Sequence, residues 1–141
     1  MKRFKAWRYK CDFCGKNGYS AGHMRHHELH CTMNPERICR VHKFVTGNDD
    51  DATIQPVVSL IAALREHWND EDHGVKHLRD ITDGCPCCIL AVIRQSGASK
   101  GYTDEDGYSP PHIGQEQFDF KKEMASLWAD VNDTAREGSC Y

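Results

Sequence analysis

The clearest hydrophobic pattern in the chain is a stripe of apolar side chains at helical spacing. It consists of Ile54, Val57, Val58, Ile61, Leu64 and Trp68. Because residues three and four apart lie on one face of a helix, we predict a helix over 54–68 whose apolar face covers the core. Thr53 or Asp51 is the predicted cap, and Pro56 falls in the first turn, where its missing N–H costs little.

Polar, glycine-containing segments separate the predicted elements. Residues 46–53 and 96–114 are rich in such residues, and we expect both to be loops. Just before the first loop, alternating residues over 40–45 predict a short strand. Residues 73–81 predict a short helix that ends at Asp83-Gly84.

Two further helices are predicted in the second half of the chain. The apolar run over 89–95 indicates a helix that emerges from Cys85-Pro86-Cys87-Cys88. A last helix over 116–136, closed by Gly138, is indicated by Phe120, Met124, Leu127, Trp128 and Val131. We expect this helix to pack through Phe120, Leu127 and Trp128.

Together these elements predict a small α+β protein that is mostly helical. Asn34-Pro35 interrupts the chain, because a residue before proline avoids helical geometry. We therefore expect a head over 1–35 and a helical body over 36–141. The 141 residues contain no apolar run near the roughly 18 that would suggest a membrane span, and the first residues lack a secretory signal. We expect a cytoplasmic protein.

Charge is distributed unevenly between these two parts. Residues 1–48 hold ten Lys/Arg and three Asp/Glu, a balance of +7, whereas residues 49–141 hold eight and eighteen, a balance of −10. The sum is the net charge of −3. A basic head and an acidic body favour different binding partners.

The head contains a set of cysteines and histidines at metal-ligand spacing. Two residues separate Cys11 from Cys14, twelve separate Cys14 from His27, and three separate His27 from Cys31. On a helix His27 and Cys31 share a face, so all four side chains could meet one tetrahedral zinc ion. Two alternative pairs, His26 with His30 and His27 with His30, remain open.

This stretch of about 25 residues resembles the classical zinc finger, here with cysteine as the last ligand. The resemblance includes Tyr9, the Cys14-Gly15-Lys16 turn, and Tyr19 and Met24 as small-core residues. It implies a ββα finger stabilised by zinc. Two features depart from the pattern: Tyr19 comes one residue late, and Gly22 weakens the helix by about 1 kcal/mol relative to alanine.

A second metal site is predicted from two further pairs. Cys39 and His42 are separated by two residues, as are Cys85 and Cys88, and together they supply the four ligands that zinc requires. Cys87 is a possible replacement ligand, and so are His73 and His77. Cys140 is expected to be a free thiol on a frayed tail.

A longer motif joins the two sites. His30-Cys31-Thr32-Met33-Asn34-Pro35, followed by Arg37-Ile38-Cys39, resembles a pattern found in small zinc proteins of bacteriophages and their hosts. The Cys85-Pro86-Cys87-Cys88 knuckle before an apolar helix is similar as well. The resemblance implies metal sites but no particular activity, and for a phage-encoded chain it implies the host cytoplasm.

The basic head predicts binding to nucleic acid through phosphate contacts. The candidate cations are Lys2, Arg3, Lys5, Arg8, Lys10, Lys16 and Arg25. Trp7 and Tyr9 lie among them and could stack on bases. If the head docked as classical fingers do, Ser20, His23 and His26 would face base edges.

The alternative interpretation is a protein–protein adaptor or inhibitor that acts through the acidic body or the finger surface. Its candidate segments are Asp49–Asp51, Asp70–Asp72 and Asp104–Asp106. An enzyme is not expected, since a catalytic zinc keeps an open position whereas both predicted sites have four protein ligands. We therefore expect neither a small-molecule substrate nor a membrane partner.

Overall fold

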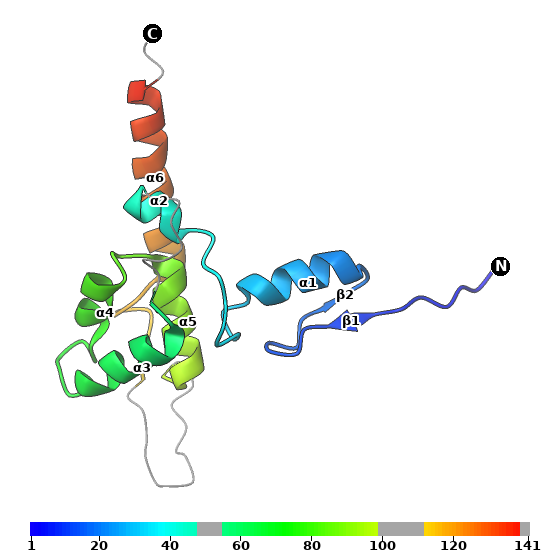
Figure 1. The fold of residues 1–141 in the computed structure, drawn as a ribbon, viewed down its shortest axis with the longest axis horizontal. Helices are drawn as coiled ribbons and strands as arrows, with labels where there is room; N and C mark the ends of the chain where they lie inside the picture. Colours follow the sequence, from blue (N-terminus) through cyan, green and yellow to red (C-terminus); the bar gives the residue numbers. More distant parts are fainter. Residues whose placement is uncertain (48–54, 99–111, 139–141) are drawn as a thin grey trace, which may run out of the picture.

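The computed structural model describes residues 1–47, 55–98 and 112–138 (Figure 1). Over these ranges the protein is small and mostly helical, with six helices and one two-stranded sheet. None of the described helices combines the length and apolar character needed to cross a membrane. The predicted caps Thr53 and Asp51, most of both predicted loops, the acidic segments Asp49–Asp51 and Asp104–Asp106, and Cys140 lie outside the described residues.

The chain begins with an exposed arm that leads into a short hairpin and a helix. Strand β1 (Tyr9–Lys10) pairs antiparallel with β2 (Asn17–Gly18), so that Tyr9 faces Gly18. Helix α1 (Ala21–His30) follows, with the Ser20 side chain accepting a hydrogen bond from the His23 N–H at 3.3 Å. Serine is favoured at this cap position because its side-chain oxygen accepts a hydrogen bond from a backbone N–H of the first turn.

The segment predicted as a strand over 40–45 is instead helix α2 (His42–Thr46). Val41 and Val45, four residues apart, pack against the same buried cysteines, and His42 between them is buried. This burial follows helical rather than alternating spacing. Gly47, with φ of 67°, ends the helix.

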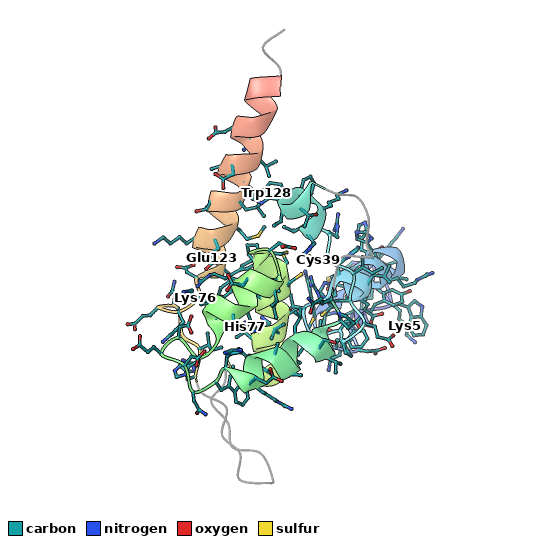
Figure 2. All side chains as sticks on the ribbon, turned by 60° about the vertical axis from the view of Figure 1, so that its left-hand side comes forward. Lys5, Cys39, Lys76, His77, Glu123 and Trp128 are labelled. Carbon is teal, nitrogen blue, oxygen red and sulfur yellow. The ribbon has the colours of Figure 1, made fainter. Side chains whose placement is uncertain are left out.

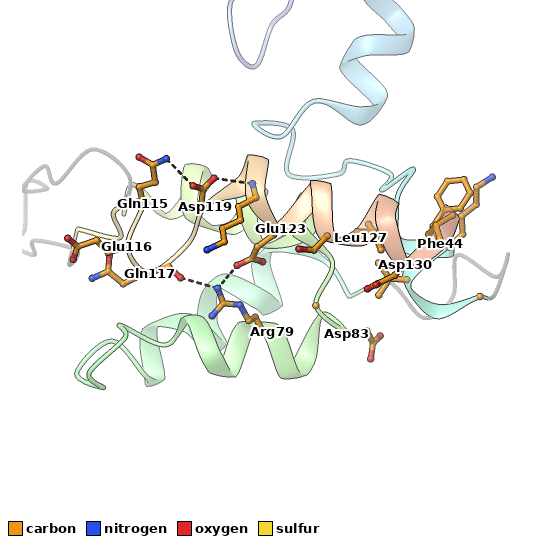
Figure 3. Close-up of a pocket in the computed structure, with 17 residues that line it drawn as sticks. Phe44, Arg79, Asp83, Gln115, Glu116, Gln117, Asp119, Glu123, Leu127 and Asp130 are labelled. Atoms are coloured by element: carbon orange, nitrogen blue, oxygen red, sulfur yellow. Dashed lines mark hydrogen bonds and ion pairs between the residues drawn. The ribbon is translucent and has the colours of Figure 1, made fainter. Parts of the chain in front are cut away.

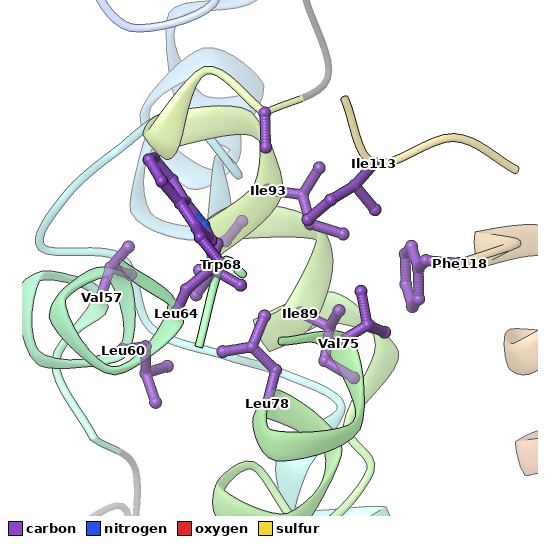
Figure 4. Close-up of a cluster of buried hydrophobic side chains, with 13 residues drawn as sticks. Val57, Leu60, Leu64, Trp68, Val75, Leu78, Ile89, Ile93, Ile113 and Phe118 are labelled. Carbon is purple, nitrogen blue, oxygen red and sulfur yellow. The ribbon is translucent and has the colours of Figure 1, made fainter. Parts of the chain in front are cut away.

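Three helices form the main core: α3 (Val57–Glu66), α4 (Val75–Ile81) and α5 (Pro86–Ser96). Figure 4 shows Leu64, Leu78 and Ile89 packed together between these helices, and all three side chains are fully buried. The predicted stripe on α3 needs one correction. Val58 is 68 % exposed and Leu60 is buried in its place, because the buried face runs through positions 57, 60 and 64.

Helix α6 (Phe120–Gly138) joins the core mainly by its first turn. Phe120 packs on the core cluster, to which Ile113 and Phe118 also belong (Figure 4). Arg79 of α4 forms an ion pair with Glu123 and donates to the Gln117 carbonyl at 3.0 Å. Beyond this point α6 extends past the other helices (Figure 1). The predicted packing therefore holds for Phe120, whereas Trp128 is 38 % exposed.

Hydrogen bonds tie the head to the body across the predicted boundary at residue 35. Arg94 and Gln95 of α5 reach the segment after α1: Arg94 donates to the Thr32 hydroxyl at 2.8 Å, and Gln95 donates to the carbonyls of Thr32 and Asn34. Asn34 is buried and donates to the Glu28 carbonyl at 2.8 Å. The turn after α1 is therefore fixed to α5.

Candidate metal centres

The head brings together Cys11, Cys14, His27 and Cys31. Their ligand atoms all lie within 4.8 Å of one another, and Cys14 Sγ is 3.2 Å from His27 Nε2. Cys11 and Cys31 are buried and Cys14 is exposed. These are the four residues that the spacing in the sequence singled out.

Local structure explains this convergence. Cys11 and Cys14 flank a tight turn that Gly15 completes with φ of 76°, a left-handed conformation that favours glycine. His27 lies in the last turns of α1 and Cys31 is its C-cap. Met24 packs with Cys11 and Cys31 and is the one buried residue of α1. The small core of the head therefore consists largely of its own candidate ligands.

The competing histidines of α1 have other contacts. His30 Nδ1 donates to the Ile38 carbonyl at 2.8 Å, and the His26 ring meets the His30 ring edge to face. His23 and His26 are exposed. Of the four histidines in this run, the structure therefore places His27 among the cysteines and uses His30 to hold the following turn.

A second cluster joins the body to the segment before α2. Cys39, Cys85 and Cys88 are buried, with ligand atoms within 4.8 Å of one another, and the sulfurs of Cys39 and Cys85 lie 3.6 Å apart. Cys85 caps α5 and Cys88 lies in its first turn, with Pro86 between them. The start of a core helix thus carries two of the three thiols.

His42, the predicted fourth ligand, lies beside Cys88 and is 3 % exposed, although it is not part of the group whose ligand atoms all lie within 4.8 Å of one another. Its Nδ1 is 3.6 Å from Cys88 Sγ, and its Nε2 is 3.5 Å from a carboxylate oxygen of Asp83. Nε2 lacks a closer hydrogen-bond partner. A buried imidazole with one nitrogen toward thiols and the other toward a carboxylate matches the way metal-bound histidines are oriented.

The other residues considered for this site lie differently. Cys87 is half-buried and packs against the cluster. His73 Nδ1 donates to the Trp68 carbonyl at 3.2 Å, and the His77 ring stacks on His67 with centroids 4.0 Å apart. Neither histidine belongs to the described ligand groups.

Crowding of the thiols perturbs their ionisation. Burial raises the pKa of Cys31 to about 11, and hydrogen bonding to Cys39 raises the pKa of Cys85 to about 11. The same contacts lower the pKa of Cys39. Without a cation, neighbouring thiolates repel one another, so each cluster can ionise fully only around a positive charge.

All described cysteines are free thiols, so neither cluster is a set of disulfides. Buried sulfur and imidazole groups at this separation are a donor set that suits a metal ion. The two clusters could therefore each hold one ion. Such sites could stabilise this small fold, because metal binding and folding are coupled when the ligands come from distant segments.

The candidate nucleic-acid-binding residues are all exposed on the head: Arg3, Lys5, Trp7, Arg8, Lys10, Lys16, His23 and Arg25. Figure 2 shows Lys5 well away from Cys39. Tyr19, expected in the small core, is 70 % exposed, and the Arg8 guanidinium lies over its ring at 5.3 Å. Strand β2 ends at Gly18, and a side chain at that position would point toward Met24. The next residue, Tyr19, therefore points the other way, toward solvent. Phe4, which the sequence pattern did not single out, is 85 % exposed.

Comparison with known proteins gives no match for this chain among family models, curated proteins or solved structures. Its own geometry therefore defines its class, a small and mostly helical protein with two Cys/His clusters that could hold metal ions.

Proposed function

We propose that the chain is a zinc-binding accessory protein whose basic head binds nucleic acid. One zinc is held by Cys11, Cys14, His27 and Cys31, and the hairpin with α1 then acts as a ββα finger. The other zinc is held by Cys39, His42, Cys85 and Cys88. The convergence of sulfur and nitrogen donors within 4.8 Å in the first set, and of three thiols beside His42 in the second, supports this assignment.

Both zinc sites have a structural role in this proposal. Four protein ligands leave no position for a substrate or an activated water, so the protein is not an enzyme. The metal instead links segments that are distant in the sequence, namely Cys39 and the start of α5. The zinc of the first site holds the head in the conformation that exposes its cationic side chains.

The surface of the head is the observation that carries the nucleic-acid proposal. Trp7 is 84 % exposed between Lys5 and Arg8, and Tyr19 presents a second exposed ring beneath Arg8. Cations bind phosphates without regard to sequence, whereas aromatic rings stack on unpaired bases. This combination favours single-stranded over double-stranded nucleic acid.

Fluorescence anisotropy with a labelled single strand and the matching duplex tests this function. The zinc-loaded protein should bind the single strand more tightly, and its affinity should fall steeply between about 50 and 200 mM salt. Lys5→Gln should weaken binding, whereas Lys76→Gln, with the same charge change on the body, should not. An equal loss of affinity in both variants, or an affinity that does not change with salt concentration, would refute the proposal.

A second function, protein binding by the body, is favoured by one observation. Phe44, Leu127 and Trp128 leave apolar surface open between α2 and α6. An adaptor of this kind should retain its partner when Lys5 and Trp7 are replaced, and should show no salt-dependent binding to nucleic acid.

A further inference from the structure

A groove of about 1170 Å³ lies between α2, the α4–α5 connection and α6 (Figure 3). Phe44 and Leu127 line it with apolar surface, and the rings of Phe44 and Trp128 pack in a T-shaped arrangement with their centroids 5.3 Å apart. Among the described residues, five carboxylates and three cations line it, and the ion pair of Arg79 with Glu123 takes one of each, so the lining has a formal charge of −2. An occupant should therefore combine apolar anchors with positive charge.

The first ten residues of the chain have this composition. They contain five Lys/Arg, no Asp/Glu, and the exposed side chains of Phe4 and Trp7. Phe4 and Trp7 are three residues apart, so both would face the groove if the arm formed a helical turn on binding. In Figure 1 the arm extends from the head on the side away from α6.

We propose that two copies of the chain associate by exchanging these arms, each arm occupying the groove of the other copy. The arm points away from its own groove, so the complementary groove is that of a second molecule. Reciprocal exchange gives a closed dimer rather than an open chain of subunits. The dimer does not depend on the proposed nucleic-acid binding, but the two compete if both are correct, because both use Lys5 and Trp7.

Sedimentation velocity of the full, zinc-loaded chain at several protein concentrations and at low and high salt tests the dimer. The wild type should form dimers that dissociate as salt rises, since screening weakens charge attraction across the interface. Ser126→Arg places a cation in the groove, whereas Ala125→Arg adds the same charge on an exposed neighbour that does not line it. Only Ser126→Arg should raise the dimer dissociation constant, by about tenfold or more.

Replacement of the arm anchors supplies an independent test. Phe4→Ser with Trp7→Ser should raise the dimer dissociation constant at least as much, without altering metal content or helicity, because neither side chain is buried in one copy. A monomer under all conditions, or a dimer unaffected by both Ser126→Arg and the arm variant, overturns the proposal. If the dimer proposal is overturned but Ser126→Arg still binds nucleic acid, the proposed nucleic-acid-binding function stands on its own.

Discussion

Gln95 donates its side-chain amide to the main-chain carbonyl of Thr32 at 2.8 Å. Thr32 follows Cys31 of the first cluster, and Gln95 lies on α5, the helix that starts at Cys85 and Cys88 of the second. One short path therefore joins the two candidate metal centres.

Gln95→Ala should loosen the head from the body while leaving both metal ions in place. It removes the donor to two carbonyls and should destabilise the junction by about 1 kcal/mol or somewhat more. Faster hydrogen exchange at the N–H groups of Asn34 and Arg37 would report this change. Gln55→Ala, at an exposed position before α3, is the control, and equal exchange rates in both variants would contradict the expectation.

Cys14→Ser should unfold the head, because its small core is made mostly of the proposed ligands. Elemental analysis should show zinc falling from two ions per chain to one, and NMR should show collapse of the head resonances. The matched variant His23→Ala changes an exposed residue and should keep both ions. A folded, zinc-free Cys14→Ser head would refute the first site.

A comparison of two separate variants, His42→Ala and Cys87→Ser, identifies the fourth ligand of the second site. His42→Ala should remove or greatly weaken the second zinc, because three thiols then remain. Cys87→Ser should leave it bound, since Cys87 is only half-buried beside the cluster. The reverse pattern of zinc content would assign Cys87 as the ligand.

Asp83→Asn should weaken the second zinc without removing a ligand. Asp83 lies 3.5 Å from His42 Nε2, and loss of such an outer carboxylate typically costs about 10–100-fold in metal affinity. Competition with a chromophoric chelator measures the change. Asp80→Asn, at an exposed position on α4, should have no effect, and a similar loss in both variants would indicate a general charge effect.

Zinc affinity should fall as pH falls. The pKa values of Cys31 and Cys85 lie at about 11 in the metal-free protein, so both are thiols at neutral pH and must lose protons when zinc binds. Binding therefore releases protons and weakens in acid. Calorimetry in buffers of different ionisation enthalpy should count at least one proton released per ion, and zero release would contradict the thiolate assignment.

The spacing of residues predicted much of the helical structure and all four members of the first cluster. Helices α3 and α6 carry apolar residues at intervals that only a helix places on one face, and α5 was predicted from the apolar run that follows its cysteine knuckle. Helix α2 was missed because five residues are too few for alternation and helical spacing to differ, and its conformation depends on burial of His42 against distant thiols. The outward position of Tyr19 was missed for a related reason, since it depends on where β2 ends.

By itself the sequence determined which residues could bind metal, because two-residue and three-residue spacings bring ligands together through local turns and helix geometry. It also determined the charge contrast between head and body. The pairing of Cys39 with Cys85 was also predicted from the sequence, whereas the tertiary structure alone decided that Asp83 lies beside His42 Nε2 and that α6 leaves an acidic, apolar groove. These relationships join residues far apart in the chain, and they depend on how helices pack rather than on any local pattern.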